Sequence, residues 1–558
     1  MRWWRGSQVE RKVYDAVAET LAYLGVKVFF GLIGSGNFHV SNALCEWGAQ
    51  FIPARHEGGA ITMADAWARL TGLVGVCTVH QGPGLTNTMT GLTEAVKSRT
   101  PLLLLAADTA GAAVRSNFKI DQEGLVRSVG AIAERVHGPA TVVEDTVRAW
   151  WRAQVERRPV VLMLPLDVQS APFEGKVSIP PIAPIYPARP SGEAVTRTLY
   201  ALEAAQRPLI IAGRGAVISG ARDALEALGE QVGALMATSA AANGLFAGNP
   251  WYVGISGGFA SPAAAELIAS ADLVLAFGAS LNMWTTRHGK LINPGATVVQ
   301  VDHEPQALGY HHRVDIAVLG DARQTALELL RELLGHDISR QGWRTDEVAR
   351  KLAEGCWQRA PYEDRSSELQ IDPRTLSRAL DEMLPEEKVL VTDSGHFMGY
   401  PAMYIRVPDA QGFVFTQAYQ SVGLGLATAI GAAIARPDRL TVAALGDGGA
   451  LMGLSELETV ARLGLHMLIV IYNDSAYGAE VHHFGPEGAP LDIVRFPDFD
   501  FAPLAEAVGI RGVTVRKLED LETVGQWLEA EAEGAMLVDA KVVPDVVAEW
   551  LEEAFRGH

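Results

Sequence analysis

Residues 440–449 read Leu-Thr-Val-Ala-Ala-Leu-Gly-Asp-Gly-Gly, a largely apolar run that ends in a glycine-rich loop. A helix-like stretch follows, and then a second apolar run at 467–472 that ends in Asn473 and Asp474. Continuous apolar runs are typical of strands buried on both faces of a parallel sheet, where helices connect successive strands. The stretch therefore predicts a strand, a loop, a helix and a second strand, with Asp447 and Asp474 at the carboxyl ends of the two strands.

The same alternation recurs along the chain. Apolar runs precede Gly31-Leu-Ile-Gly-Ser-Gly36 and His80-Gln-Gly-Pro-Gly84. Further runs lie at 101–106, 208–212, 273–277, 298–301 and 389–392. Strands that alternate with helices and end in glycine predict an α/β protein with parallel sheets.

Chain length sets the number of domains. A chain of 558 residues is too long for one hydrophobic core. The proline-rich stretch 179–190 cannot form a helix or a central strand and is typical of an extended linker. We expect three doubly wound parallel-sheet domains, at 1–178, 191–340 and 370–558.

Bulk composition narrows the class of protein. The chain is 48% hydrophobic and 20% charged, which is typical of a globular protein, and its net charge of −18 opposes binding to nucleic acid or an anionic membrane. The three cysteines are far apart, no apolar run is long enough to span a membrane, and the first residues lack an apolar signal segment. We expect a soluble cytoplasmic protein that binds a small molecule, without nucleic-acid or membrane partners.

The two aspartates indicate a metal site. Glycines at a strand end let backbone N–H groups approach phosphate oxygens, and Asp447 places a hard oxygen ligand where a phosphate-bound Mg²⁺ would lie. Asp474, returned beside it by the intervening helix, adds a second carboxylate. Either motif alone is more often a simple turn, but the two in this order favour a phosphate and metal site.

Gly446-Asp447-Gly448, followed after 24 residues by Asn473-Asp474, resembles the cofactor motif of thiamine diphosphate-dependent enzymes such as acetohydroxyacid synthase, pyruvate decarboxylase, benzoylformate decarboxylase and benzaldehyde lyase. The resemblance implies that Asp447, Asp474 and the carbonyl of Ala476 bind Mg²⁺, although Asn is commoner where Asp474 stands. The surrounding residues would contact the cofactor; they are Gly446, Gly448, Gly449, Tyr477 and Gly478. The three domains would be pyrimidine-binding, middle and diphosphate-binding.

Three further segments resemble cofactor-binding parts of this family. Glu57 resembles the glutamate that hydrogen-bonds N1′ of the aminopyrimidine and activates the cofactor, whereas the simpler interpretation is a favourable partner for a helix dipole. The carbonyl of Gln420 would accept the 4′-amino group, and Val422 would support the bent cofactor. A third loop would contact the diphosphate through Ser394, Gly395 and His396.

First-domain residues with a predicted role in substrate chemistry follow the same resemblance. Ser35 and His80 correspond to substrate-contacting and catalytic residues of benzoylformate decarboxylase, and Gln81 follows His80. Gln122 lies in a stretch similar to the one that carries an active-site glutamine in acetohydroxyacid synthase and benzaldehyde lyase. For a histidine at a strand end, a structural role is the alternative.

The third domain adds candidate proton-transfer residues. Glu480 lies six residues after Asp474, which is the spacing of a catalytic glutamate of pyruvate decarboxylase. His483 would share a helix face with Glu480, and His482 would contact substrate. A solvated polar helix end is the alternative for all three.

The resemblance implies an enzyme that uses thiamine diphosphate and Mg²⁺ to cleave a carbon–carbon bond, by decarboxylation of a 2-keto acid or by lyase chemistry on a 2-hydroxycarbonyl compound. The alternatives are a carboligase similar to acetohydroxyacid synthase and, from another class, a catalytically silent binder of thiamine diphosphate or a nucleotide. Gly213-Arg-Gly215 is an incomplete nucleotide motif, so FAD is not expected in the middle domain.

Family active sites lie between the first domain of one subunit and the third domain of another. We therefore expect a homodimer at least, and favour a tetramer. Residues 545–558 are expected to cover the site. The sequence leaves the substrate unidentified, since the pocket walls come from segments scattered over three domains.

Overall fold

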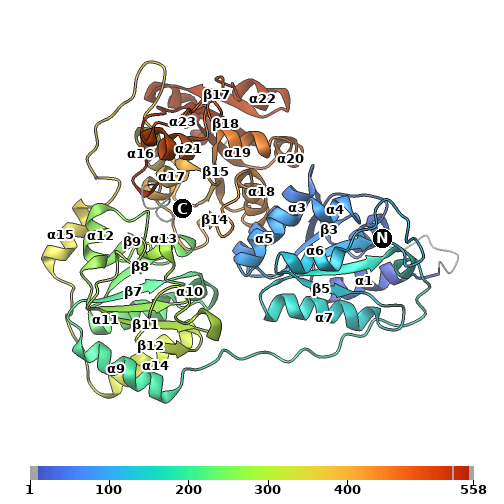
Figure 1. Cartoon of the computed structure of the whole chain (residues 1–558), viewed down its shortest axis with the longest axis horizontal. Helices are drawn as coiled ribbons and strands as arrows, with labels where there is room; N and C mark the ends of the chain where they lie inside the picture. The colour runs from blue at the N-terminus through green and yellow to red at the C-terminus, as the bar shows by residue number, and fades with distance from the viewer. Residues whose placement is uncertain (1–9, 531–532, 552–558) are drawn as a thin grey trace.

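The computed structural model describes residues 10–530 and 533–551. The N-terminal residues 1–9 and the last part of the expected covering segment, 552–558, lie outside the described residues. The described chain forms three six-stranded sheets in which paired strands run parallel (Figure 1). The predicted α/β class with three doubly wound sheets is thereby confirmed.

The first domain has the sheet order β2-β1-β3-β4-β6-β5. Its strands are β1 (Val28–Gly31), β2 (Gln50–Pro53), β3 (Gly75–Val79), β4 (Leu102–Asp108), β5 (Ile132–Arg135) and β6 (Pro159–Pro165). Its helices are α1 (Val13–Tyr23), α2 (Phe38–Glu46), α3 (Glu57–Thr71), α4 (Pro83–Thr86), α5 (Met89–Lys97), α6 (Gln122–Ser128), α7 (Val142–Val155) and α8 (Leu166–Gln169). The following residues 179–190 contain no helix or strand.

The middle domain has the order β12-β11-β10-β7-β8-β9. Its strands are β7 (Pro208–Ala212), β8 (Leu235–Thr238), β9 (Tyr252–Ile255), β10 (Leu273–Phe277), β11 (Thr297–Asp302) and β12 (Ile316–Leu319). Its helices are α9 (Gly192–Ala204), α10 (Arg214–Ile218), α11 (Arg222–Val232), α12 (Pro262–Ala269), α13 (Met283–Thr286), α14 (Ala322–Gly335) and α15 (Asp346–Glu354).

The third domain has the order β14-β13-β15-β16-β18-β17, the same pattern as the first domain. Its strands are β13 (Lys388–Thr392), β14 (Phe413–Phe415), β15 (Leu440–Gly446), β16 (Met467–Asn473), β17 (Arg511–Val515) and β18 (Ala535–Lys541). Its helices are α16 (Pro373–Met383), α17 (Gly399–Tyr404), α18 (Gly425–Ala435), α19 (Asp447–Met452), α20 (Glu456–Leu463), α21 (Gly478–Phe484), α22 (Ala502–Ala507) and α23 (Glu522–Glu529).

Strand order determines where ligands can bind. The order reverses between β1 and β3 in the first domain and between β13 and β15 in the third. In open α/β sheets, ligands bind outside the carboxyl ends of the strands at such a reversal. The segments at these two points, 32–37 and 80–82 in the first domain and 393–396 and 446–449 in the third, contain ten of the 21 predicted site residues.

The first and third domains pack together through helices α3 and α18 (Figure 1). One apolar cluster runs through both domains, with Ile61 and Met63 of α3 and Ile430 of α18 among its buried members. Gly431 permits the close approach, because a Cβ atom there would collide with the carbonyl oxygen of Met63. Helix α3 is therefore fixed against the third domain of its own chain.

The cysteines and the apolar helices bear on two expectations from the sequence, namely widely separated cysteines and no membrane-spanning segment. Cys45, Cys77 and Cys356 are all free thiols. Among the described residues, no helix is long and apolar enough to cross a membrane.

Candidate active site

A cavity of about 1000 Å³ lies where the three domains meet. The loops at the carboxyl ends of β13, β15 and β16 form one wall, together with the segment before α18. Most of the predicted cofactor-binding residues line this cavity, namely Ser394, Gly395, His396, Gln420, Val422, Gly446, Asp447, Gly448, Gly449, Asp474, Ala476, Tyr477 and Gly478. The structure therefore brings together residues from loops more than 80 positions apart in the sequence.

Asp393 organises the loops of this wall. Its buried carboxylate accepts the backbone N–H of Ser394 at 2.8 Å and that of Gly423 at 3.0 Å. Gly449 must lack a side chain, because its Cβ would collide with Asp393. Burial raises the pKa of Asp393 to about 6, although the backbone N–H groups act in the opposite direction.

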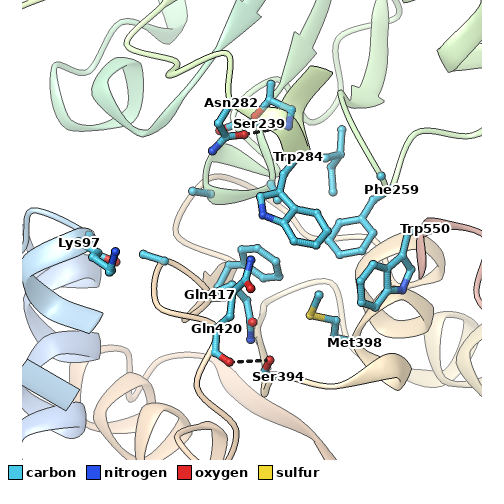
Figure 2. Close-up of a pocket in the computed structure, with 18 of the residues that line it drawn as sticks. Lys97, Ser239, Phe259, Asn282, Trp284, Ser394, Met398, Gln417, Gln420 and Trp550 are labelled. Atoms are coloured by element: carbon cyan, nitrogen blue, oxygen red, sulfur yellow. Dashed lines mark hydrogen bonds between the residues drawn. The ribbon is translucent and has the colours of Figure 1, made fainter. Parts of the chain in front are cut away.

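The segment expected to support a bent cofactor has an unusual backbone. Gln420 has a φ of +59°, which is rare for a residue other than glycine. Ser394 donates from its hydroxyl to the carbonyl of Gln420 at 3.4 Å, as drawn in Figure 2. Val422 is 39% exposed, so its apolar side chain is open to the cavity that it lines.

Asp447 and Asp474 lie against each other at the ends of β15 and β16. Burial raises the pKa of Asp447 to about 6, and burial together with the charge of Asp447 raises the pKa of Asp474 to about 8. Two carboxylates held this close repel each other unless a cation lies between them. Hydrogen bonds from backbone N–H groups do not offset this repulsion, since the pKa values of both carboxyl groups stay raised.

The residues present fit Mg²⁺ bound to a diphosphate. Among the described residues, no cluster of three or more His, Cys, Asp or Glu side chains could hold a metal by themselves. Mg²⁺ usually takes one or two carboxylates and completes its octahedron with phosphate oxygens and water. Asp447 and Asp474 supply two such ligands. The N–H of Ala476 donates to Asp474 at 3.1 Å, and the carbonyl of Ala476 stays the predicted third ligand.

Glu480 and its two neighbouring histidines, His482 and His483, lie in different surroundings. Glu480 lines the cavity, whereas His482 and His483 are not among its lining residues. The ring of His482 packs against that of His396, with centroids 4.3 Å apart, and the ring of His483 packs edge-on against Phe484. The i, i+3 spacing therefore does not bring His483 to the cavity wall beside Glu480.

The C-terminal segment packs against this wall. Nε2 of His396 accepts the backbone N–H of Ala548 at 2.8 Å, and the Tyr400 hydroxyl donates to the carbonyl of Val546 at 2.7 Å. Burial lowers the pKa of His396 to about 3, so this ring is a neutral acceptor. The described part of the segment that was expected to cover the site, 545–551, thus lies beside it.

An aromatic wall faces the loops that are predicted to bind the cofactor. Trp550 of the C-terminal segment lies 6.0 Å from Phe259 and 6.1 Å from Trp284, both of the middle domain, measured between ring centroids. Phe259 also meets Phe415 edge-on. Figure 2 shows Phe259, Trp284 and Trp550 together above Met398 and the Ser394–Gln420 pair. This wall is one of the functional features missed in the sequence, since its members come from separate segments.

Cations line the end of the cavity between the first and middle domains, where Lys97, Arg99, Arg157 and Arg214 lie. Among the described residues, Arg99 is the one of these four in an ion pair, with Glu304 at 2.9 Å. Burial and the charge of Arg69 lower the pKa of Arg214 to about 9. These four cations outnumber the carboxylates of Asp302 and Glu304, which also line the cavity, in a chain of net charge −18.

Close packing of two backbone segments explains why glycine stands at both ends of Gly213-Arg-Gly215. A Cβ at Gly213 would collide with the backbone of Gly278, and one at Gly278 with that of Gly215. The close approach of the ends of β7 and β10 explains the motif without a nucleotide.

The first-domain candidates form a second group, with Ser35, Glu57 and His80 in the segments that follow β1, β2 and β3. Glu57 begins helix α3, is 9% exposed and accepts from Nδ2 of Asn87 at 3.0 Å. Burial lowers the pKa of His80, although the nearby charge of Glu57 raises it. Gly36 donates its N–H to Nδ1 of His80 at 3.0 Å, which leaves Nε2 available. Neither Glu57 nor His80 lines the cavity where the three domains meet.

The remaining first-domain candidates lie next to His80. Ser35 is exposed on the 32–37 loop, and Gln81 is buried with an Oε1 atom that lacks a hydrogen-bond partner. The amide of Gln122 accepts from the N–H of Gly82 at 2.8 Å and donates to the carbonyl of Ala107 at 3.0 Å. Gln122 therefore holds the turn after His80, and its catalytic role stays a prediction.

Comparisons with known proteins match all three domains. Models of the thiamine pyrophosphate enzymes match at 11–125 (N-terminal TPP binding domain), 195–330 (central domain) and 393–540 (C-terminal TPP binding domain). A sulfoacetaldehyde acetyltransferase of Castellaniella defragrans is 30% identical over 536 residues, covering 91% of this chain and 88% of that protein. A probable 2-ketoarginine decarboxylase of Pseudomonas aeruginosa is 31% identical over 531 residues, covering 92% and 91%. An acetolactate synthase large subunit of Parasynechococcus marenigrum is 29% identical over 535 residues, covering 92% and 84%.

Proposed function

Because the chain belongs to the thiamine pyrophosphate enzymes, we propose that it cleaves the carbon–carbon bond next to the carbonyl of a 2-keto acid by non-oxidative decarboxylation. A 2-hydroxycarbonyl compound cleaved in the same way is a variant of this proposal. One relative carries the name of a probable 2-ketoarginine decarboxylase, which supports decarboxylation.

The cavity residues would hold the cofactor and its metal. Asp447, Asp474 and the carbonyl of Ala476 are the proposed ligands of Mg²⁺, and the loop glycines leave room for diphosphate oxygens. Thiamine diphosphate supplies a carbon nucleophile and an electron sink for the bond cleavage. Val422 and the carbonyl of Gln420 would hold it in its bent shape.

The observation that carries the proposal is the position of Glu480. Its carboxyl group lines the same cavity as the Asp447 and Asp474 pair, on the helix that begins after the 474–477 turn. A carboxyl group there can hold a proton and deliver it to the product carbon after CO₂ has left. Protonation releases an aldehyde and separates decarboxylation from transfer of the same carbon to a second substrate.

A complete site would need two copies of the chain. Glu57 and His80 lie in a group that does not line the cavity of their own chain. Exposed apolar side chains flank both groups, with Phe38 and Phe118 in the first domain and Met452 and Phe484 in the third. A homodimer in which the first domain of one subunit covers the third domain of the other would bury both surfaces and bring Glu57 to the cofactor. We propose such a dimer at least, with a tetramer as the favoured assembly.

The cationic end of the cavity supports a second candidate. Lys97, Arg99 and Arg157 would attract an anionic second substrate, such as another 2-keto acid or an inorganic anion. The relatives include an acetolactate synthase and an acetyltransferase, so carboligation or acyl transfer is the runner-up.

The test is turnover of a panel of 2-keto acids by the purified protein with thiamine diphosphate and Mg²⁺, following CO₂ and identifying the organic product. We expect CO₂ and free aldehyde, and a loss of roughly a hundredfold or more for Glu57→Gln, since general acid–base groups contribute at least that much. A 2-hydroxyketone or an acyl product would support the runner-up. Absence of thiamine diphosphate binding would contradict both candidates.

A further inference from the structure

The loop that would support the bent cofactor is held by the first domain of the same chain. Glu94 on helix α5, which is fully buried, accepts the N–H of Tyr419 at 2.7 Å and that of Ala418 at 3.2 Å. Arg69, near the end of helix α3, donates from Nη1 to the carbonyl of Phe415 at 3.0 Å. Two first-domain side chains therefore bind both ends of the 415–419 segment.

Glu94 and Arg69 also bind each other. Nη2 of Arg69 lies 2.9 Å from Oε1 of Glu94, and the hydroxyl of Ser98 donates to the same oxygen at 2.9 Å. Burial alone would raise the pKa of Glu94, but Arg69 and the N–H donors lower it below its ordinary value. Glu94 is therefore a charged acceptor, and hydrogen bonds to a charged acceptor are stronger than those to a neutral one.

The segment held in this way leads directly into the cofactor-binding positions. Gln420 follows Tyr419 and has the left-handed φ of +59°, which surrounding contacts must impose. Asp393 holds the far side through the N–H of Gly423. Residues 420–422 therefore lie between two fixed points, one bound by Glu94 of the first domain and one bound by Asp393 of the third.

We propose that Glu94 and Arg69 are positioning residues for the cofactor site of their own subunit. They set the 415–422 loop so that the Gln420 carbonyl and Val422 give the bound cofactor its bent shape. The inference rests on the proposed function, in which Glu57 serves the site of the partner subunit. Helix α3 (Glu57–Thr71) then takes part in two active sites, through Glu57 at its start and through Arg69 near its end.

The first test compares Glu94→Gln with a matched control. Asp145→Asn changes another buried carboxylate of the first domain, which accepts the N–H of His137 at 2.9 Å and pairs with Arg148 at 2.8 Å, but which does not line the cavity. For Glu94→Gln we expect thiamine diphosphate to bind roughly tenfold more weakly, kcat to fall more than KM changes, and the near-ultraviolet circular dichroism of the bound cofactor to change. Arg69→Lys, which keeps the charge and loses the Phe415 contact, should act in the same direction. Values for both variants equal to those of Asp145→Asn would overturn the proposal.

The second test uses mixed dimers of Glu57→Gln and Glu94→Gln subunits, isolated through two different affinity tags. If Glu57 acts in the partner's site and Glu94 in its own, one site of the mixed dimer carries both changes and the other carries neither. The mixed dimer should then have about half of the wild-type activity, well above either parent. If both residues served the same site, no intact site would form, and activity no higher than that of the Glu94→Gln parent would overturn the inference.

The two levels of the proposal fail separately. A wild-type protein that binds no thiamine diphosphate contradicts the proposed function and the inference together. A wild-type protein that binds the cofactor and turns over substrate, with Glu57→Gln inactive, upholds the proposed function; cofactor binding and kcat of Glu94→Gln and Arg69→Lys equal to those of Asp145→Asn then contradict the inference alone.

Discussion

Oε1 of Glu456, on helix α20 of the third domain, accepts the backbone N–H of His56 at 3.0 Å. The same oxygen accepts the N–H of Arg55 at 3.0 Å, and the side chain of Glu456 is 2% exposed. His56 is the N-cap of helix α3, so a buried carboxylate of the third domain fixes the point at which Glu57 begins the helix. The orientation of Glu57 therefore depends on the packing of two domains of one chain.

Glu456→Ala should lower both stability and activity. Two backbone N–H groups lose their buried acceptor, which costs roughly 1–3 kcal/mol, because each hydrogen bond contributes a net of about 0.5–1.5 kcal/mol. We expect a lower Tm and, since Glu57 loses its support, a kcat reduced beyond the effect on KM. Thermal unfolding and steady-state kinetics measure both quantities. Glu458→Gln, which removes the neighbouring and more exposed partner of Arg55, is the control; an equal loss of kcat in both variants would contradict the prediction.

The metal-free protein should lose stability as the pH rises. The pKa values of Asp447 and Asp474, raised to about 6 and about 8, lie above the unfolded value of about 3.9. The folded state therefore binds more protons than the unfolded state, and unfolding free energy falls between about pH 4 and pH 8. In the proposed function, Mg²⁺ with thiamine diphosphate would bind the deprotonated pair, so its effect on Tm should be larger at the upper end of this range.

Asp474→Asn provides the check on that prediction. Removing one charge should raise the Tm of the metal-free protein near the upper end of that pH range and weaken its Mg²⁺-dependent cofactor binding. Differential scanning calorimetry with and without Mg²⁺ measures both effects. A metal-free wild-type Tm that stays constant across this range would argue against the repulsive pair.

Glu480→Gln should slow formation of the aldehyde product. Without a proton donor in the cavity, kcat should fall by about a hundredfold or more, while thiamine diphosphate affinity stays the same. Stopped assays that quantify CO₂ and aldehyde separately will show which step is lost. Glu487→Gln, an exposed residue beyond helix α21, is the control. Unchanged aldehyde formation in Glu480→Gln would remove this residue from the mechanism.

Trp284→Ala should widen the range of accepted substrates. Its indole forms part of the aromatic wall with Phe259 and Trp550, so its removal enlarges the cavity on that side. We expect kcat/KM to rise for 2-keto acids with bulky side chains relative to small ones. Trp251→Ala, which removes a partly buried tryptophan stacked on Arg344 elsewhere in the middle domain, is the control. The same ratio in both variants would show that the wall does not contact substrate.

Strands with strong apolar runs could be predicted from the sequence to the residue. The runs at 208–212 and 273–277 coincide with β7 and β10, which are buried along their whole length. Edge strands such as β5 (Ile132–Arg135) and β17 (Arg511–Val515) were missed, because half-buried strands need few apolar residues and resemble loops.

The sequence by itself determined the fold class, the family resemblance and the pairing of Asp447 with Asp474. These follow from local runs and from adjacent parallel strands, whose carboxyl ends must meet at one edge of the sheet. Only the tertiary structure decided that Glu57 does not line the cavity of its own chain. It also decided that Glu94, Arg69, Asp393 and the aromatic wall surround the loops that are predicted to bind the cofactor. Contacts of this kind join residues up to 346 positions apart, such as Arg69 and Phe415. Side-chain types in a sequence carry no record of which distant backbone groups they will meet once the domains pack.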